Sequence, residues 1–171
     1  MQLESFLESS ARQRPDKIAI VAGNRRWSYA QLEASANRLA HALQAEGVER
    51  GDRVAVWLDN GVEAVAAIFA ILKAGAVLVM VNPTTKADKL RFLLNHSRAA
   101  ALFAPASKVA GLVETVGITG SAVGVRSKVG AVVDDTRRVV FVSANGVTVA
   151  AGAHPASAAS ASSIAMEKPR T

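Results

Sequence analysis

The residue types that hold phosphate gather in GITGSAVGVRSK, from Gly117 to Lys128. Glycines and hydroxyl residues allow successive backbone N–H groups to aim at a phosphate, and a Lys neutralises its charge. This segment follows no apolar strand, and its residues lack the tight order of a phosphate loop. A Gly-rich linker is therefore the favoured interpretation. VVFVSANGVTV, residues 139–149, offers a better strand, but no Lys or Arg follows it closely.

The remaining candidates for acid–base or metal chemistry are isolated. We expect His41 to face outward on a helix, His96 to lie at a helix end that favours positive charge, and His154 to lie in a tail. Asp134 and Asp135 precede Arg137 and Arg138, which indicates a charged turn that balances itself. The chain has no Cys, so it offers no thiolate nucleophile or ligand. We predict no catalytic and no metal-binding residue, and the cofactor-binding residues stay unknown.

Helical and strand-like segments alternate up to about Ala104. Apolar spacing predicts a first helix on Leu3, Phe6 and Leu7 that ends at Pro15, and KIAIVAG predicts a strand that turns at Gly23 and Asn24. Ser28 with Gln31 is a capping box for the next helix, which ends near Gly47. Its predicted apolar stripe comprises Leu32, Ala36, Leu39, Ala40 and Leu43.

A second round of strand and helix follows a turn at Arg50, Gly51 and Asp52. RVAVWL predicts a strand, and Asn60 with Glu63 predicts a helix start. We expect its apolar side to comprise Val62, Val65, Ile68, Phe69 and Leu72. A later helix is predicted to start at Thr85 and Asp88, with Leu90, Leu93 and Leu94 inward, before the buried strand AAALFA.

The join between these rounds is ILKAGAVLVMVNP, Ile71 to Pro83. Gly75 suits a helix end that needs positive φ, and the apolar run after it predicts a strand covered on both faces. Asn82 and Pro83 then stop the strand at the edge where parallel sheets usually face a ligand. The fold class predicted is α/β, a partial doubly wound and mostly parallel sheet flanked by helices.

The amino-acid composition of the sequence changes after Ala104. The later residues hold few large apolar side chains, and Phe141 is their one aromatic. We predict a partial domain over residues 1–104, a β and Gly-rich segment over 105–150, and a poorly ordered tail over 151–171. In the middle segment, a turn at Ala144, Asn145 and Gly146 would join VVFVS to VTVA as a hairpin.

Bulk properties exclude several classes. The net charge is +6, but the basic residues are scattered and form neither a dense run nor an aromatic-and-basic motif, so we do not expect nucleic-acid binding. Glu4 and Glu8 lie where a signal peptide would be basic and then apolar. Lys73 and Gly75 interrupt the longest apolar stretch, which predicts no membrane span, and the cytoplasm is the expected compartment.

Two motifs resemble the N-terminal part of the adenylate-forming (AMP-forming) acyl-CoA synthetases. WSYAQLEASANRLAHAL, from Trp27 to Leu43, is similar to the family's first core motif, and ILKAGAVLVMVNP is similar to its second. GVERGDRVAVWLDNGVEAVAAIFA lies between them in matching order, so the resemblance covers Leu7 to about Pro105. Asn82 and Pro83 are closer to the carboxylate-CoA ligases than to amino-acid adenylation domains, where Asp-Pro is usual.

The resemblance implies a reaction that joins a carboxylic acid to ATP and passes the acyl adenylate to CoA, with Mg²⁺. The family's phosphate loop has Pro before its Lys, which Gly117 to Lys128 lacks, and its catalytic Lys belongs to a C-terminal lobe. We therefore expect a truncated family member, linked to fatty-acid metabolism, that does not catalyse the reaction alone.

Alternatives to this interpretation remain open. The chain could be a non-catalytic interaction module, with self-association through an uncovered sheet edge, or a fragment of an amino-acid adenylation domain. The change after Ala104 could reflect an evolved tail or, as we favour, reading out of frame in GC-rich DNA.

Overall fold

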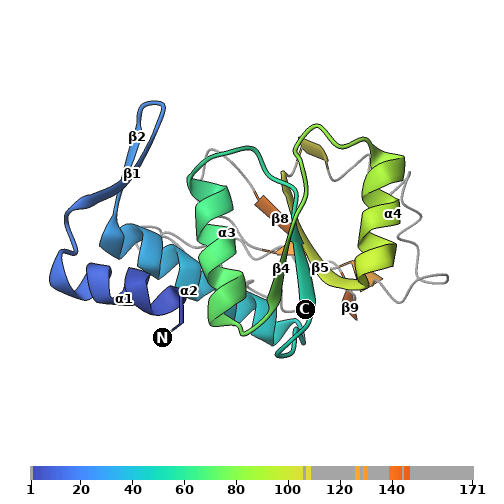
Figure 1. Cartoon of the computed structure of the whole chain (residues 1–171), viewed down its shortest axis with the longest axis horizontal. Coiled ribbons are helices and arrows are strands. Elements are labelled where there is room, and N and C mark those ends of the chain that lie inside the picture. The colour runs from blue at the N-terminus through green and yellow to red at the C-terminus, as the bar shows by residue number, and fades with distance from the viewer. Residues whose placement is uncertain are drawn as a thin grey trace, which may run out of the picture.

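The computed structural model describes residues 2–105, 107 and 108, together with the backbone of four short strands further along the chain (Figure 1). Those strands are β6 (Arg126–Ser127), β7 (Val129–Gly130), β8 (Val139–Ser143) and β9 (Asn145–Gly146). The predicted tail over 151–171 lies outside the described residues.

A parallel sheet forms the centre of the structure. β3 (Arg53–Val56) lies between β4 (Val77–Met80) and β5 (Ala99–Pro105), and both neighbours run parallel to it. β8 then pairs with β5 in the antiparallel direction, with Phe103 opposite Phe141. The strand order is β4-β3-β5-β8-β9-β6, and β7 pairs with β8.

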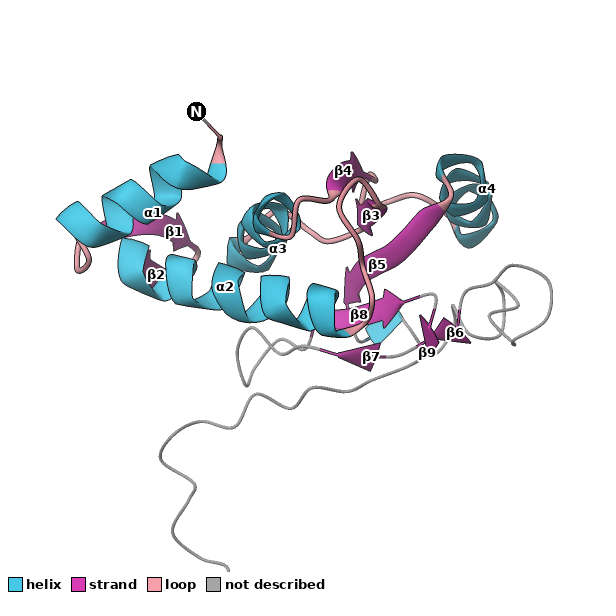
Figure 2. Ribbon diagram, turned by 90° about the horizontal axis from the view of Figure 1, so that it is seen from below, coloured by secondary structure: helices cyan, strands magenta, loops and turns pink. Residues whose placement is uncertain are grey.

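Helices cover both faces of this sheet, as the doubly wound prediction requires. α2 (Tyr29–Ala45) and α3 (Val62–Lys73) lie on one side, with α1 (Glu4–Gln13) beyond them, and α4 (Ala87–Ser97) lies on the other (Figure 2). Side chains alternate along β3 accordingly. Val54 and Val56 belong to the apolar cluster shared with the first three helices, whereas Ala55 belongs to a second cluster with Leu90 of α4.

A hairpin stands apart from the main sheet. β1 (Ile18–Ala22) and β2 (Arg25–Ser28) pair only with each other, in a two-stranded antiparallel sheet. Gly23 has a φ of +59°, which permits the tight turn predicted between the two strands. The sequence predicts the turn and the first strand, but the strand does not join the parallel sheet.

The start of α2 follows the sequence prediction closely. Ser28 Oγ accepts the backbone N–H of Gln31 at 3.3 Å, and the Ser28 backbone N–H donates to Gln31 Oε1 at 2.9 Å. The predicted capping box is therefore confirmed. The whole predicted stripe of α2 is buried: Leu32, Ala36, Leu39, Ala40 and Leu43.

Two other predicted helix starts are wrong in their capping residue. α3 has Gly61 at its N-cap in place of Asn60, and α4 has Lys86 in place of Thr85, with no side-chain cap bond at either. Both helices begin within two residues of the predicted position. Backbone geometry at the strand-to-helix turn therefore sets these starts without a side-chain acceptor.

The predicted apolar side of α3 is confirmed in part, because Val65 and Phe69 pack against the hydrophobic core. Val62 is buried, but Val65, Ile68, Phe69 and Leu72 are only half-buried, and the fully covered residues are smaller. Among them are Ala66, Ala67 and Ala70. α3 packs against α2 and against β3 and β4, and small alanine side chains permit close approach between such elements.

The strand β4 has cover on both faces, as predicted, but the cover is incomplete: Leu78 packs against the first apolar cluster and Val79 against the second. Within the described residues it pairs only with β3, and Val77 and Met80 are 48% and 56% exposed. The apolar run that suggests a fully buried strand therefore belongs to the edge of the described sheet. β5 fulfils its prediction, because Ala101 through Ala104 are buried.

Candidate functional site

The carboxyl edge of the parallel sheet is the place where the sequence predicts a ligand. Trp57 directly follows β3, and its backbone N–H donates to Phe103 O at 2.8 Å. Asn82 and Pro83 follow β4 after Val81. Asn82 Oδ1 accepts both the backbone N–H and the hydroxyl of Thr84, at 2.9 and 2.8 Å. The amide oxygen is therefore used in a turn that stops the strand.

Trp57 and Lys108 meet at this edge. Lys108 Nζ lies 4.6 Å from the centroid of the Trp57 ring and donates to Pro83 O at 3.0 Å. The Trp57 side chain is buried, and its Nε1–H has no hydrogen-bond partner among the described residues. Sequence analysis missed both residues, because neither belongs to a recognisable motif.

A buried ion network ties the first three helices together. Lys73 Nζ, at the end of α3, lies 2.7 Å from Glu8 Oε1 of α1 and 2.8 Å from Glu33 Oε1 of α2. Asn37 Nδ2 also donates to Glu33 Oε1, at 3.1 Å. The Lys73 side chain is 8% exposed, so solvent screens these interactions little. The signal in the sequence is a single Lys at the end of an apolar helix.

The network shifts the pKa of two of its members. Burial alone lowers the pKa of Lys73, but hydrogen bonds and charge from Glu33 and Glu8 outweigh burial and raise it above its ordinary value. The hydrogen bond to Lys73, followed by the charge of Lys73, lowers the pKa of Glu8. These shifts hold Lys73 and Glu8 in their charged forms, which suits a structural clamp rather than a proton-transfer site.

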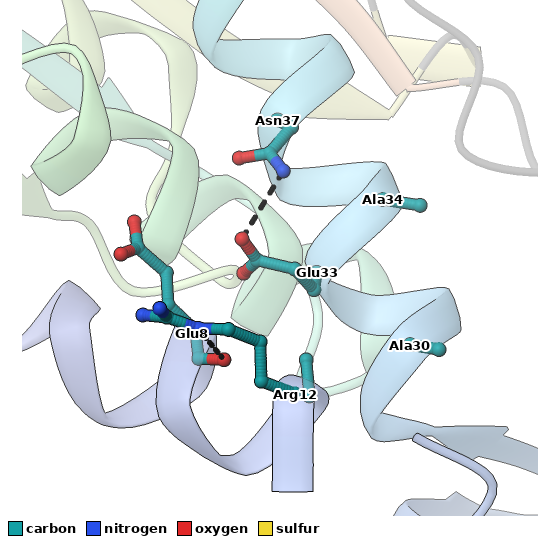
Figure 3. Close-up of a pocket in the computed structure, with 7 residues that line it drawn as sticks. Glu8, Arg12, Ala30, Glu33, Ala34 and Asn37 are labelled. Carbon is teal, nitrogen blue, oxygen red and sulfur yellow. Dashed lines mark hydrogen bonds between the residues drawn. The ribbon is translucent and has the colours of Figure 1, made fainter.

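Two open hollows flank this network. One, of about 580 Å³, lies between α1 and α2 and is lined by Glu8, Arg12, Glu33 and Asn37 with small alanines (Figure 3). The other, of about 360 Å³, reaches from Gln2 to Gln44 and includes His41. The second hollow contains Ser5, His41 and Glu8, but Ser5 Oγ donates to Gln2 O at 2.6 Å and Glu8 is paired with Lys73. Among the described residues no hydrogen bond joins these three side chains, so they do not form a catalytic arrangement.

A further ion pair fastens the hairpin to the helices. Arg25 Nη1 of β2 bonds Glu63 Oε1 in the first turn of α3, and Arg25 also lies 5.7 Å from the Trp27 ring centroid. Glu63 is buried, so a partner for its charge is required. Its place in the first turn agrees with the prediction, although its carboxylate pairs with Arg25 rather than only with the helix terminus.

The other residues weighed from the sequence do not come together. His41 is exposed on α2, as expected, and His96 lies in the last turn of α4, stacked on Phe92 at 5.6 Å between ring centroids. Asp134, Asp135 and His154 lie outside the described residues. So does the candidate loop from Gly117 to Lys128, apart from the backbone of β6. Val139–Ser143 is a strand as predicted, but VTVA lies outside the described residues.

The described part of the chain holds no cluster of carboxylate or imidazole side chains that would bind Mg²⁺. Every helix described is too short or too polar to cross a lipid bilayer.

Layered helices on both faces of a parallel sheet define a doubly wound α/β protein, and comparison with known proteins refines that class. The chain belongs to the AMP-binding enzyme family, which it matches over residues 7–166. The match begins at Leu7, as predicted, and extends beyond Pro105, where the predicted resemblance ends.

Curated relatives come from two groups. The chain is 45% identical over 100 residues to phosphinothricin tripeptide synthetase PhsC of Streptomyces viridochromogenes, covering 58% of this chain and 9% of that protein. It is 44% identical over 88 residues to a medium/long-chain-fatty-acid–CoA/3-oxocholest-4-en-26-oate–CoA ligase of Mycobacterium tuberculosis, covering 52% and 16%.

Solved structures share the fold. A benzoate CoA ligase from Burkholderia xenovorans has a TM-score of 0.64 at 26% identity, covering 70% of this chain and 24% of that one. The N-terminal domain of FACL13 from Mycobacterium tuberculosis has a TM-score of 0.64 at 30% identity, covering 72% and 32%. The chain thus spans less than a fifth of these curated relatives and less than a third of these structures.

Proposed function

We propose that this chain supplies the first α/β layer of an enzyme that activates a carboxylic acid with ATP. The observation that carries the proposal is the family match over residues 7–166, together with both core motifs on described elements. The parent reaction is formation of an acyl adenylate and then of acyl-CoA, for which ATP, Mg²⁺ and CoA are the implied cofactors.

The described residues position this layer and do not carry out the reaction. Trp27 to Leu43 builds β2 and α2, and Ile71 to Pro83 builds the passage from α3 into β4. Their polar groups are used in a capping box, an ion network and a turn. We therefore propose that the chain alone does not adenylate a substrate.

An exchange assay tests this proposal. Purified chain of confirmed mass is incubated with ATP, labelled pyrophosphate and a panel of carboxylic acids, and we expect no acid-dependent exchange. Acid-dependent exchange above a heat-denatured sample would overturn the proposal.

Within the family, we assign the chain to the carboxylate-CoA ligases. Asn82 and Pro83 at the end of β4 support this assignment. A peptide synthetase among the relatives keeps an amino-acid adenylation domain as the alternative. The cytoplasm remains the predicted compartment, on the absence of Cys.

A second candidate is a non-catalytic interaction module. The open edge of β4, with Val77 and Met80 exposed, favours it, because such an edge can pair with another strand. In size-exclusion chromatography, a discrete oligomer would support a module, whereas soluble aggregate would support a catalytic layer that lacks its cover.

The origin of residues after Ala104 is tested by the coding DNA. Reading out of frame predicts that another frame downstream of codon 104 encodes a Ser/Thr/Gly-rich loop ending in Pro-Lys-Gly. The family match extends to residue 166, which is what a family sequence read in frame would produce. If neither of the other two reading frames encodes such a loop, the hypothesis of reading out of frame is overturned.

A further inference from the structure

Trp57 places an unused hydrogen-bond donor at the carboxyl edge of the sheet. The residue is 6% exposed, and its Nε1–H has no acceptor among the described residues. The indole group can only donate, and a buried donor without an acceptor is unfavourable. Among the described residues, therefore, no acceptor atom lies beside Trp57 Nε1.

Lys108 places a positive charge beside the same ring, with no counter-charge among the described residues. Its ammonium group has three N–H donors, of which one is used by Pro83 O at 3.0 Å. Within the described residues no carboxylate pairs with Lys108, and its contact with the Trp57 ring is made through the ring face at 4.6 Å. Because Lys108 is half-buried, a counter-ion would stabilise its charge more than it would stabilise a fully exposed lysine.

The two requirements are met together by one kind of ligand. A water molecule could accept from Trp57 Nε1–H but would leave the Lys108 charge without a counter-ion. A cation would be repelled by the positive charge of the Lys108 ammonium group, so it does not suit this site. Because the indole N–H lies in the ring plane and the ammonium lies over the ring face, the ligand needs oxygen atoms that point in two directions.

We propose that Trp57 and Lys108 bind a small oxyanion, a carboxylate or phosphate group, at the carboxyl edge of β3 and β4. The Trp57 N–H donates to one oxygen, and Lys108 neutralises the charge while its bond to Pro83 O fixes its position. Asn82 takes no part, because its amide oxygen already accepts twice from Thr84. This site goes beyond the proposed function and does not depend on adenylation.

Fluorescence of the full 171-residue chain tests the site. The chain has two Trp residues, so Trp27→Phe leaves Trp57 as the sole reporter. Sodium phosphate and sodium acetate are titrated separately, against sodium chloride at matched ionic strength. We expect a saturable change in Trp57 emission with at least one oxyanion and a matching rise in thermal midpoint, with the preferred probe distinguishing the phosphate from the carboxylate source.

Variants locate the binding on Lys108. Lys108→Met in the Trp27→Phe background should weaken binding at least tenfold, and Lys108→Arg should retain it within about threefold, because a cation remains. Lys89→Met removes an exposed lysine of α4 as a matched control and should leave the affinity unchanged. Circular dichroism confirms that each variant is folded, and Lys108→Arg keeps the test decisive if the Met variant is not.

Three results would overturn the proposal. They are the absence of a saturable response to either oxyanion, an equal response to chloride, and unchanged affinity in folded Lys108→Met. None of them bears on the exchange assay for adenylation, so the two proposals fail separately.

Discussion

Lys73 Nζ lies 2.8 Å from Glu33 Oε1, so the last residue of α3 is held by α2 across 40 residues of sequence. Glu8 of α1 completes the contact from the other side, at 2.7 Å. α1 buries little apolar surface, because Leu7 is its buried residue and Leu3 and Phe6 are exposed. The ion pair between Glu8 and Lys73 therefore helps to hold α1 against the other helices.

Lys73→Met should destabilise the chain by about 2–3 kcal/mol, below the usual cost of breaking a fully buried pair because Glu8 is partly exposed. The change leaves the Glu33 carboxylate, whose side chain is 17% exposed, with Asn37 as its remaining donor among the described residues. Urea unfolding followed by circular dichroism measures the loss. Asp88→Asn breaks the exposed pair with Arg91, at 3.7 Å, and should cost less than about 0.5 kcal/mol. Equal effects of the two changes would contradict a buried network.

The network should also give a pH-dependent contribution to stability. The lowered pKa of Glu8 means that its share is present above the ordinary value of 4.5 and is lost as pH falls through the lowered value. The raised pKa of Lys73 means that its share is present below 10.5 and is lost as pH rises through the raised value. The difference in unfolding free energy between wild type and Lys73→Met should therefore be largest between these limits. A difference that does not change with pH would contradict this.

Ser28→Ala should remove about 1 kcal/mol, because the Ser28 side chain satisfies a free N–H at the start of α2. Thr85→Ala is the matched comparison, since the sequence also predicts Thr85 as a helix start but the structure gives it no capping bond. Its effect should stay within about 0.5 kcal/mol. Chemical denaturation of both variants measures the contrast, and a larger loss at Thr85 would oppose the capping assignment.

Gly75→Ala should cost at least about 1–2 kcal/mol, because Gly75 has a φ of +73°, where a Cβ is strained. An added Cβ would also lie 3.3 Å from Arg50 Cγ, whereas at Gly23, with a φ of +59°, nothing lies within 4 Å. Gly23→Ala should therefore cost less. In an Arg50→Ala background, Gly75→Ala should cost about as much unfolding free energy as Gly23→Ala. If Gly75→Ala still costs more in that background, the contact with Arg50 Cγ does not account for the extra cost.

Local chemistry is what made parts of this fold predictable. Ser28, Gln31 and the stripe on α2 act through neighbours one turn away, so their spacing in sequence carries the information. Gly75 is predictable for the same reason, because helix ends need a residue that tolerates positive φ.

The errors come from contacts between distant segments. The fully buried residues of α3 include Ala66 and Ala70, whereas larger apolar residues at helical spacing are only half-buried, which periodicity alone does not reveal. The apolar run of β4 looks like a central strand, although only the sheet order shows that Val77 and Met80 lie at an edge. The pairing of Trp57 with Lys108 is equally non-local, since it arises where β3 and the residues after β5 meet.

The pairing of β8 with β5 has a consequence for synthesis. Phe103 of β5 leaves the ribosome well before its partner Phe141. The edge of β5 that pairs with β8 therefore stays unpaired at first, while the helices around β5 can already pack. During that interval the nascent chain presents the backbone donors and acceptors of β5 to any extended segment nearby. The order of synthesis, and not only the final contacts, therefore influences whether β5 pairs with β8 of its own chain or with a strand of another chain.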